Sequence, residues 1–203
     1  MSQNPKLDNL SNLSTPLFII GAAHTGKSEL VLQLVEPDHL VVVLGTASTK
    51  EPEFTDRLSL LKSLRPNHWH CIEDISSISQ IYEQATQQYD SVIIDSINQW
   101  VASFIVENIK SYSTTQLQDL IDHELSSLLT LIETSKTPTY IVSTEVGGGL
   151  SPKGQVPRLF RQMVSRYNCL LANISQSVLL VSAGIPLVLK SSTLSETLTD
   201  AEA

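Results

Sequence analysis

Cysteine is scarce in this sequence. The chain of 203 residues has two, Cys71 and Cys169, and neither belongs to a C-x-x-C motif or to a cluster of cysteines and histidines. This usage argues against a disulfide framework and against a cysteine-ligated metal site. A free cysteine behaves as a small hydrophobic residue, so we expect both side chains in the core of a protein from a reducing compartment.

Positive charge and long apolar runs are also lacking. The 13 Lys and Arg residues against 21 Asp and Glu give a net charge of −8, which provides no basic surface for nucleic acid. No apolar run approaches 18 residues, and the polar first 14 residues lack the basic and apolar regions of a signal peptide. We therefore expect a cytoplasmic protein with no membrane span and no nucleic-acid partner.

The motif that is present lies near the N-terminus, between an apolar run and a run of helix formers. Leu17-Phe18-Ile19-Ile20 leads into a G-x-x-x-x-G-K-S loop, and residues 29–35 follow it. Glycines let successive backbone N–H groups and the helix N-terminus point at phosphate oxygens. The residues predicted to bind nucleotide in this phosphate loop are Gly21, Ala22, Ala23, His24, Thr25, Gly26, Lys27 and Ser28. The alternative, a glycine-rich turn that matches by accident, is disfavoured by the strand and helix on either side.

An acidic residue follows another apolar run. Residues 91–94 read as a buried strand that ends at Asp95. In phosphate-loop proteins a carboxylate at this place helps to hold Mg²⁺ opposite the loop hydroxyl, and the loop lysine meets the β- and γ-phosphates. We expect Ser28 and Asp95 to bind Mg²⁺, with Lys27 and Asp95 as catalytic residues. The alternative is a parallel strand that ends in an acid by chance.

The apolar run at residues 40–44 ends at Gly45-Thr46-Ala47. Ligands of open α/β sheets bind beyond the carboxyl ends of the strands, so we expect this segment beside the phosphate loop. A plain strand-to-helix turn is the alternative.

The remaining pattern alternates strands with helices. Strands are expected over 68–72, 139–144, 178–181 and 187–189, and helices over 51–64, 75–89, 96–109, 115–135 and 156–172. This predicts an α/β fold of the P-loop NTPase type: a mostly parallel sheet, covered by helices on both faces, with a C-terminal hairpin at one edge. We expect residues 15–190 to form one nucleotide-binding domain, between a flexible arm (1–14) and a flexible acidic tail (191–203).

Two other sets of side chains allow more than one interpretation. His68 and His70 could suggest a metal, but without a third ligand in view one core and one surface histidine is the simpler expectation. Three arginines in the last predicted helix (Arg158, Arg161 and Arg166) are by default solvated charges, although a nucleotide pocket needs some cation.

With these pieces in order, residues 17–190 resemble the bifunctional adenosylcobinamide kinase/adenosylcobinamide-phosphate guanylyltransferase family of cobalamin biosynthesis. The resemblance is carried by the phosphate loop, by Arg65-Pro66-x-His68-Trp69, by Thr144-Glu145-Val146-Gly147, and by Arg158-x-Phe160-Arg161 followed by Asn168. It implies a ring-like homo-oligomer, such as a trimer, that takes nucleotide (ATP or GTP) and a corrinoid, adenosylcobinamide, as substrates. Carried over residue by residue, it implies nucleotide contacts at the phosphate loop and at Gly45, Thr46, Ala47, Lys62, Ser63, Leu64, Arg65, Glu73 and Asp95.

One position departs from the family. The family holds the guanylyl group on a histidine in the helix before Arg-Pro, and in this sequence that position is Leu60. A phosphoramidate to GMP needs a nitrogen nucleophile, which leucine lacks, whereas phosphoryl transfer relies on positioning and electrostatics. The sequence thus favours a kinase of the aminopropanol arm with guanylyl transfer in doubt. A regulatory or assembly homologue that binds nucleotide without turnover, and a generic small-molecule kinase, are the alternatives.

Overall fold

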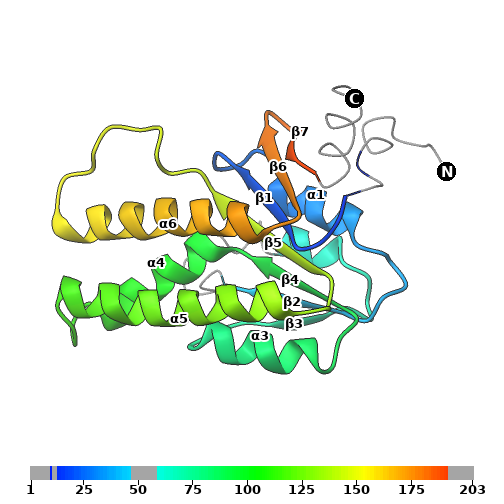
Figure 1. Cartoon of the computed structure of the whole chain (residues 1–203), viewed down its shortest axis with the longest axis horizontal. Coiled ribbons are helices and arrows are strands. Elements are labelled where there is room, and N and C mark those ends of the chain that lie inside the picture. The colour runs from blue at the N-terminus through cyan, green and yellow to red at the C-terminus, as the bar shows by residue number, and fades with distance from the viewer. Residues whose placement is uncertain (1–9, 11–12, 47–58, 192–203) are drawn as a thin grey trace, which may run out of the picture.

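The computed structural model describes Leu10 and residues 13–46 and 59–191. In this part of the chain, seven strands form one sheet in the order β3-β2-β4-β5-β1-β6-β7 (Figure 1). The strands are β1 (Leu17–Gly21), β2 (Val41–Gly45), β3 (His70–Ile72), β4 (Ser91–Asp95), β5 (Thr139–Thr144), β6 (Ser177–Ser182) and β7 (Ile185–Lys190). The helices are α1 (Lys27–Leu34), α3 (Ile78–Thr86), α4 (Ile97–Asn108), α5 (Thr114–Thr134) and α6 (Gln155–Ile174), and residues 59–63 are also helical.

The sheet confirms the expected fold class. The first six strands pair in parallel, and only β6 and β7 pair antiparallel, as the hairpin at one edge. Helices α3 to α6 lie on one face of the sheet and α1 lies on the other (Figure 1). None of the described helices is long and apolar enough to cross a membrane.

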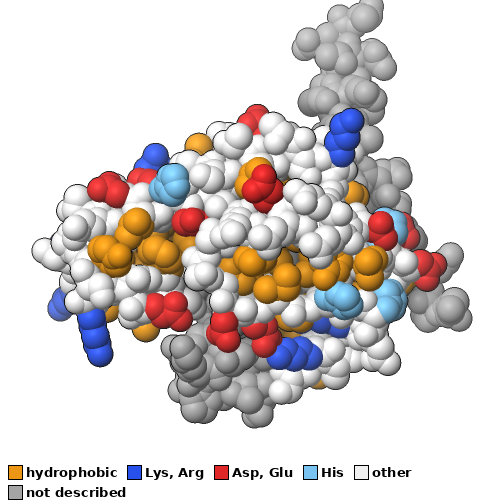
Figure 2. Space-filling model, turned by 90° about the horizontal axis from the view of Figure 1, so that it is seen from below, with side chains coloured by type: hydrophobic (Ala, Val, Ile, Leu, Met, Phe, Trp, Pro, Cys, Tyr) orange, Lys and Arg blue, Asp and Glu red, His pale blue; other side chains and the backbone are white. Residues whose placement is uncertain are grey.

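Each face of the sheet has its own hydrophobic core, because side chains of a strand alternate between faces. Within β4, Val92 and Ile94 pack toward α3–α6, whereas Ile93 packs toward α1. Large side chains such as Trp100 of α4 fill the first core and are almost completely buried. Figure 2 shows, on the face seen from below, hydrophobic side chains gathered in a band between charged ones.

The long helix α5 follows its expected pattern. Its buried residues (Leu117, Ile121, Leu125, Leu128 and Ile132) recur every three or four positions, and Leu120, expected in the same stripe, faces solvent instead. Ser113 and Gln116 form a capping box at its N-terminus.

Two expectations about core residues were wrong. Cys71 and Cys169 are both exposed, because Cys71 lies on the edge strand β3 and Cys169 on the outer side of α6. His68 and His70 are also both exposed, with Trp69 buried between them, so neither histidine is a core residue. Nor does any group of three or more His, Cys, Asp or Glu side chains gather as a metal site within the described residues.

The predicted arm and tail lie mostly outside the described residues. Within residues 1–14 the structure describes Leu10, Leu13 and Ser14, and Leu10 is buried in the core on the α1 face. Of the tail, the structure describes Ser191 alone. Ala47 and most of the helix expected over 51–64 also lie outside the described residues.

Candidate functional site

The phosphate loop joins β1 to α1. Gly21 lies so close to β6 that an added Cβ would be 2.2 Å from the carbonyl oxygen of Val181, so only glycine fits there. Gly26 has φ 91° and His24 has φ 59°, in the region that glycine tolerates and other residues rarely adopt. The chain therefore makes a tight loop at the carboxyl edge of the sheet and enters α1 at Lys27.

Hydrogen bonds within the loop hold the side chain of Lys27. Nζ of Lys27 donates to the carbonyl oxygen of Ala22 at 2.6 Å, and Oγ1 of Thr25 donates to the same oxygen at 2.9 Å. The Lys27 side chain is 6% exposed. A buried ammonium on a flexible stem, hydrogen-bonded within its own loop, is available to anionic phosphate oxygens.

Ser28 and Asp95 meet across the sheet. Oγ of Ser28, on the first turn of α1, donates to Oδ1 of Asp95 at 3.2 Å, and Asp95 ends β4. Strand β5 separates β4 from β1, so the contact joins the end of β4 to the helix that follows β1, on the other side of β5. A hydroxyl and a carboxylate are oxygen ligands of the kind that Mg²⁺ prefers, and these two side chains fit that ion.

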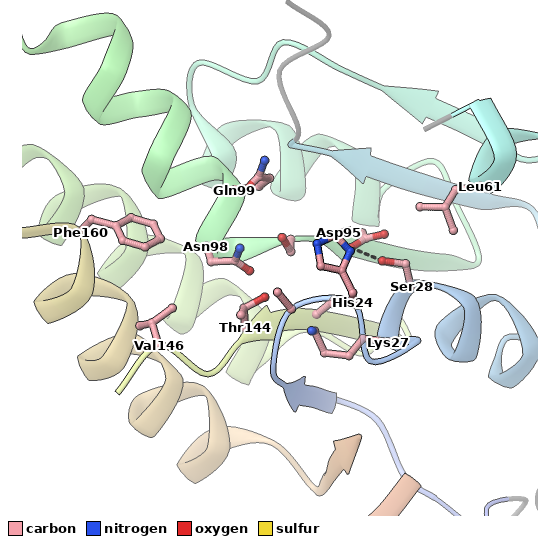
Figure 3. Close-up of a pocket in the computed structure, with 13 residues that line it drawn as sticks. His24, Lys27, Ser28, Leu61, Asp95, Asn98, Gln99, Thr144, Val146 and Phe160 are labelled. Atoms are coloured by element: carbon pink, nitrogen blue, oxygen red, sulfur yellow. Dashed lines mark hydrogen bonds between the residues drawn. The ribbon is translucent and has the colours of Figure 1, made fainter. Parts of the chain in front are cut away.

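A cavity of about 370 Å³ opens above these residues (Figure 3). Its lining comprises Ala23, His24, Lys27, Ser28, Leu61, Asp95, Ser96, Asn98, Gln99, Val142, Thr144, Val146 and Phe160. Figure 3 shows His24, Lys27, Ser28 and Asp95 at one end, Phe160 and Val146 at the other, and Asn98 and Thr144 between them. The charged groups of the lining thus lie at the phosphate-loop end.

The segment after β2 does not lie beside the phosphate loop, because β4 and β5 separate β2 from β1. Gly45 pairs with Asp95, and Oγ1 of Thr46 donates to the carbonyl oxygen of Ser96 and accepts from its N–H. These contacts hold the strand end that carries Asp95. Neither Gly45 nor Thr46 lines the cavity.

A second polar cluster lies at the edge of the sheet. Nζ of Lys62 forms an ion pair with Oε1 of Glu73 at 2.8 Å, and Nη1 of Arg65 donates to Sγ of Cys71 at 3.2 Å. Oγ of Ser63 donates to the carbonyl oxygen of Leu60, and the Leu64 side chain is 54% exposed. The residues that the resemblance implied around 62–65 and at Glu73 therefore lie together, but outside the cavity lining.

The helical residues before this cluster turn one leucine toward the cavity. Leu61 is 4% exposed and lines the cavity, whereas Leu60 is 56% exposed and does not. Of the five histidines in the chain, His24 is the one that lines the cavity. His68 contacts the carbonyl oxygen of Pro37, and His70 contacts the hydroxyl of Tyr89.

Several lining residues were not found from the sequence. Asn98 and Gln99 lie in the first turn of α4, directly after Asp95, and Phe160 comes from α6. The place of Asn98 and Gln99 at a strand-to-helix junction on the carboxyl edge of the sheet was a usable signal. Phe160 belongs to the Arg158-x-Phe160-Arg161 motif of the resemblance, but no role in a site was predicted for it, and it reaches the cavity through the packing of α6.

The three arginines of α6 contact other parts of the chain. Arg166 forms an ion pair with Asp122 of α5 at 2.9 Å, and Nε of Arg158 donates to the carbonyl oxygen of Pro152. Arg161 donates to the carbonyl oxygens of Gly147 and Leu150, in the loop that follows β5. None of the three lines the cavity, so a role as the nucleotide's cation has no support from the lining.

The chain is similar in sequence to one family of known proteins. The family model described as cobinamide kinase / cobinamide phosphate guanyltransferase matches residues 17–189. The bifunctional adenosylcobalamin biosynthesis protein CobU of Escherichia coli (strain K12) is 22% identical over 179 residues, which is 86% of this chain and 99% of the relative. The protein of the same name from Salmonella typhimurium is 24% identical over the same shares of both chains.

A solved structure supports the fold. An ATPase of the type III secretion system of pathogenic bacteria superimposes with a TM-score of 0.51 at 12% sequence identity. The match covers 94% of this chain and 56% of the ATPase chain. At this identity the likeness shows the P-loop ATPase type of fold and nothing of the substrate.

Proposed function

The chain belongs to the cobinamide kinase / cobinamide phosphate guanyltransferase family, and on that premise we propose that it phosphorylates the aminopropanol arm of a corrinoid, with ATP or GTP as donor. The observation that carries the proposal is the Ser28–Asp95 contact beside Lys27, at the mouth of the phosphate loop. Family membership supplies the acceptor, and the cavity supplies a place for it beside the phosphates.

Each residue of the loop has a role in phosphoryl transfer. The backbone N–H groups of residues 21–28 bind phosphate oxygens, together with the N-terminus of α1. Lys27 exchanges the carbonyl oxygen of Ala22 for the β- and γ-phosphates, where it stabilises charge that develops in the transition state. The acceptor hydroxyl attacks the γ-phosphorus in line from the uncharged end of the cavity. The bond from the γ-phosphorus to the β–γ bridging oxygen breaks, the nucleoside diphosphate leaves, and the hydroxyl proton is released to solvent.

Ser28 and Asp95 hold Mg²⁺ in this proposal. An ion held there would neutralise charge on the transferred phosphates. Asp95 supplies a full negative charge and Ser28 a neutral oxygen, and the present hydrogen bond keeps both oxygens turned toward one another.

The same proposal excludes guanylyl transfer through position 60. Leu60 has no nucleophile, and its side chain is outside the cavity lining. Guanylyl transfer through another residue would need a histidine that reaches an α-phosphate, and His24 is the one placed in the cavity. We propose a kinase that acts as a homo-oligomer, such as a trimer, and that leaves the guanylyl step to another enzyme.

One incubation tests the proposal against its alternatives. The protein is mixed with adenosylcobinamide, Mg²⁺ and either ATP or GTP, and the corrinoid is analysed by mass spectrometry. We expect a mass increase of one phosphate. A GMP adduct on the corrinoid would contradict the loss of guanylyl transfer, and an unchanged corrinoid would favour a nucleotide-binding regulatory homologue or a kinase of another small molecule.

A further inference from the structure

The cavity has a charged end and an uncharged end. Lys27, His24 and Asp95 lie at the phosphate-loop end, and the side chains that line the rest are apolar or neutral. A charged acceptor that enters the uncharged end would lose its hydration without gaining an opposite charge, which is strongly unfavourable. The lining therefore favours a neutral ligand at this end.

Two side-chain amides lie within this uncharged part. Asn98 and Gln99 come from the first turn of α4, which follows the strand that ends at Asp95. Oδ1 of Asn98 is buried and has no hydrogen-bond partner among the described residues. A buried acceptor without a partner is unfavourable, and this oxygen is closed off even from water, so a ligand donor gains affinity when the Asn98 amide turns Oδ1 toward the cavity. Because an amide carries both donor and acceptor, it matches a neutral hydroxyl or another amide.

Two apolar side chains line the same end. Val146 follows β5 and Phe160 extends from α6, and together they lie across the cavity from His24 (Figure 3). The cavity volume of about 370 Å³ is near the lower limit of roughly 300–1,000 Å³ for small-molecule pockets. It has room for phosphates and a short arm, so a macrocycle bearing that arm remains outside.

We infer that Asn98 and Gln99, backed by Val146 and Phe160, form an acceptor subsite that selects a short neutral alcohol by hydrogen bonds from side-chain amides. This inference rests on the proposed function for the identity of the alcohol. In a corrinoid the nitrogen of the aminopropanol arm is acylated, so the arm is neutral and presents an amide beside its hydroxyl. Free aminopropanol is a cation at neutral pH and does not fit the subsite.

Two variants that keep the approximate side-chain shape but remove the amide test the subsite: Asn98→Leu and Gln99→Met. The matched control is Gln84→Met, on the exposed side of α3. With adenosylcobinamide as acceptor, we expect KM for the acceptor to rise about fivefold in each variant, the effect of one lost neutral hydrogen bond. In both variants KM for the nucleotide should change less than twofold, and in the control neither KM should change by more than that. Thermal unfolding checks that each variant is folded.

A second measurement does not need turnover. Saturation-transfer NMR with Mg²⁺ and ADP compares a neutral probe, N-acetyl-1-amino-2-propanol, with cationic 1-amino-2-propanol. We expect the neutral probe to bind wild type, and to bind both variants more weakly.

The two measurements separate the failure of the subsite from the failure of the proposed function. If the corrinoid is phosphorylated and both variants keep the wild-type KM for it, the subsite is wrong and the kinase assignment stands. If the corrinoid is not phosphorylated, the NMR probes test the subsite by themselves. Wild type that prefers the neutral probe, with weaker binding in both variants, supports the subsite but not the corrinoid as its ligand. Equal or better binding of the cation, or no probe binding at all, overturns it.

Discussion

Oγ of Ser28 donates a hydrogen bond to Oδ1 of Asp95 at 3.2 Å, although the two residues are 67 positions apart in the chain. The contact joins the end of β4 to the first turn of α1 and places a carboxylate beside the phosphate loop. In the proposed site, a substitution at Asp95 should therefore weaken the binding of Mg²⁺ more than the binding of the nucleotide's phosphates.

The first prediction is that Asp95→Asn weakens nucleotide binding in Mg²⁺ more than in its absence. The substitution keeps an acceptor oxygen for Ser28 and removes the negative charge. We expect a loss of affinity of about ten- to a hundredfold with Mg²⁺, as for a lost hydrogen bond or ligand to a charged group, and less than threefold with EDTA. Calorimetric titrations measure both. Equal losses in the two buffers would make Asp95 a structural residue. The control is Asp119→Asn, at an exposed position of α5.

The second prediction concerns Lys27. Replacement by alanine removes the ammonium that now donates to Ala22 and would stabilise charge on the phosphates. We expect kcat to fall by at least about a hundredfold, comparable to the removal of one transition-state donor. Lys136→Ala, at an exposed loop position, should keep full activity. Undiminished turnover in Lys27→Ala would contradict the phosphate-loop assignment.

The third prediction is that the protein forms no GMP adduct that is labile in acid and stable in base. Position 60 carries an exposed leucine, which cannot hold a phosphoramidate. The test is incubation with GTP labelled at the α-phosphate, followed by gel analysis and peptide mapping. Label on a histidine would refute the loss of the transferase, and mapping to His24, the histidine of the cavity, would identify the substitute.

The fourth prediction concerns the loop after β5, which Arg161 holds through the carbonyl oxygens of Gly147 and Leu150. In Arg161→Ala both hydrogen bonds are lost, and we expect amide exchange at residues 147–150 to accelerate about tenfold. Because Val146 borders the cavity, KM for the acceptor should rise while KM for the nucleotide stays constant.

Two further variants sharpen this test. Arg161→Lys should restore little, because an ammonium lacks the planar fork that reaches two carbonyl oxygens. Arg166→Ala removes an arginine of the same helix that pairs with Asp122, and it should leave loop exchange unchanged. If Arg166→Ala accelerates exchange as much as Arg161→Ala, the effect comes from α6 as a whole.

The fifth prediction is a loss of stability at alkaline pH. Burial raises the pKa of Tyr82 above its ordinary value of 10.0, and the pKa of Tyr140 and Tyr167 is raised in the same way. The folded state thus favours the protonated phenols. Their stabilisation is fully present below pH 10 and is lost as pH rises through the raised pKa values.

Urea unfolding at pH 7 and at pH 11 measures this effect. Tyr82→Phe should flatten the pH dependence and should cost about 1 kcal/mol at pH 7, because the phenol also shares a hydrogen bond with Thr139 at 2.8 Å. Tyr112→Phe, at an exposed position, should change neither value. An unaltered pH dependence in Tyr82→Phe would show that Tyr82 does not carry the effect.

The local features of the molecule follow from its sequence. The phosphate loop was predicted because its residues are contiguous and their type is set by backbone geometry, as the close approach of Gly21 to Val181 illustrates. The strand that ends at Asp95 was predicted because a β-branched run suits a buried parallel strand. The periodicity of α5 likewise indicated which face packs on the sheet.

Tertiary structure alone decided which of these elements meet. The order of the strands separates β2 from β1, so Gly45 and Thr46 support Asp95 rather than the phosphate loop. The placement of β3 at the sheet edge exposes Cys71, and the rotation of the helical residues 59–63 turns Leu61, not Leu60, into the cavity. A sequence pattern records which residues prefer burial, whereas the neighbours of a residue depend on strand order and helix rotation, which the whole core sets at once.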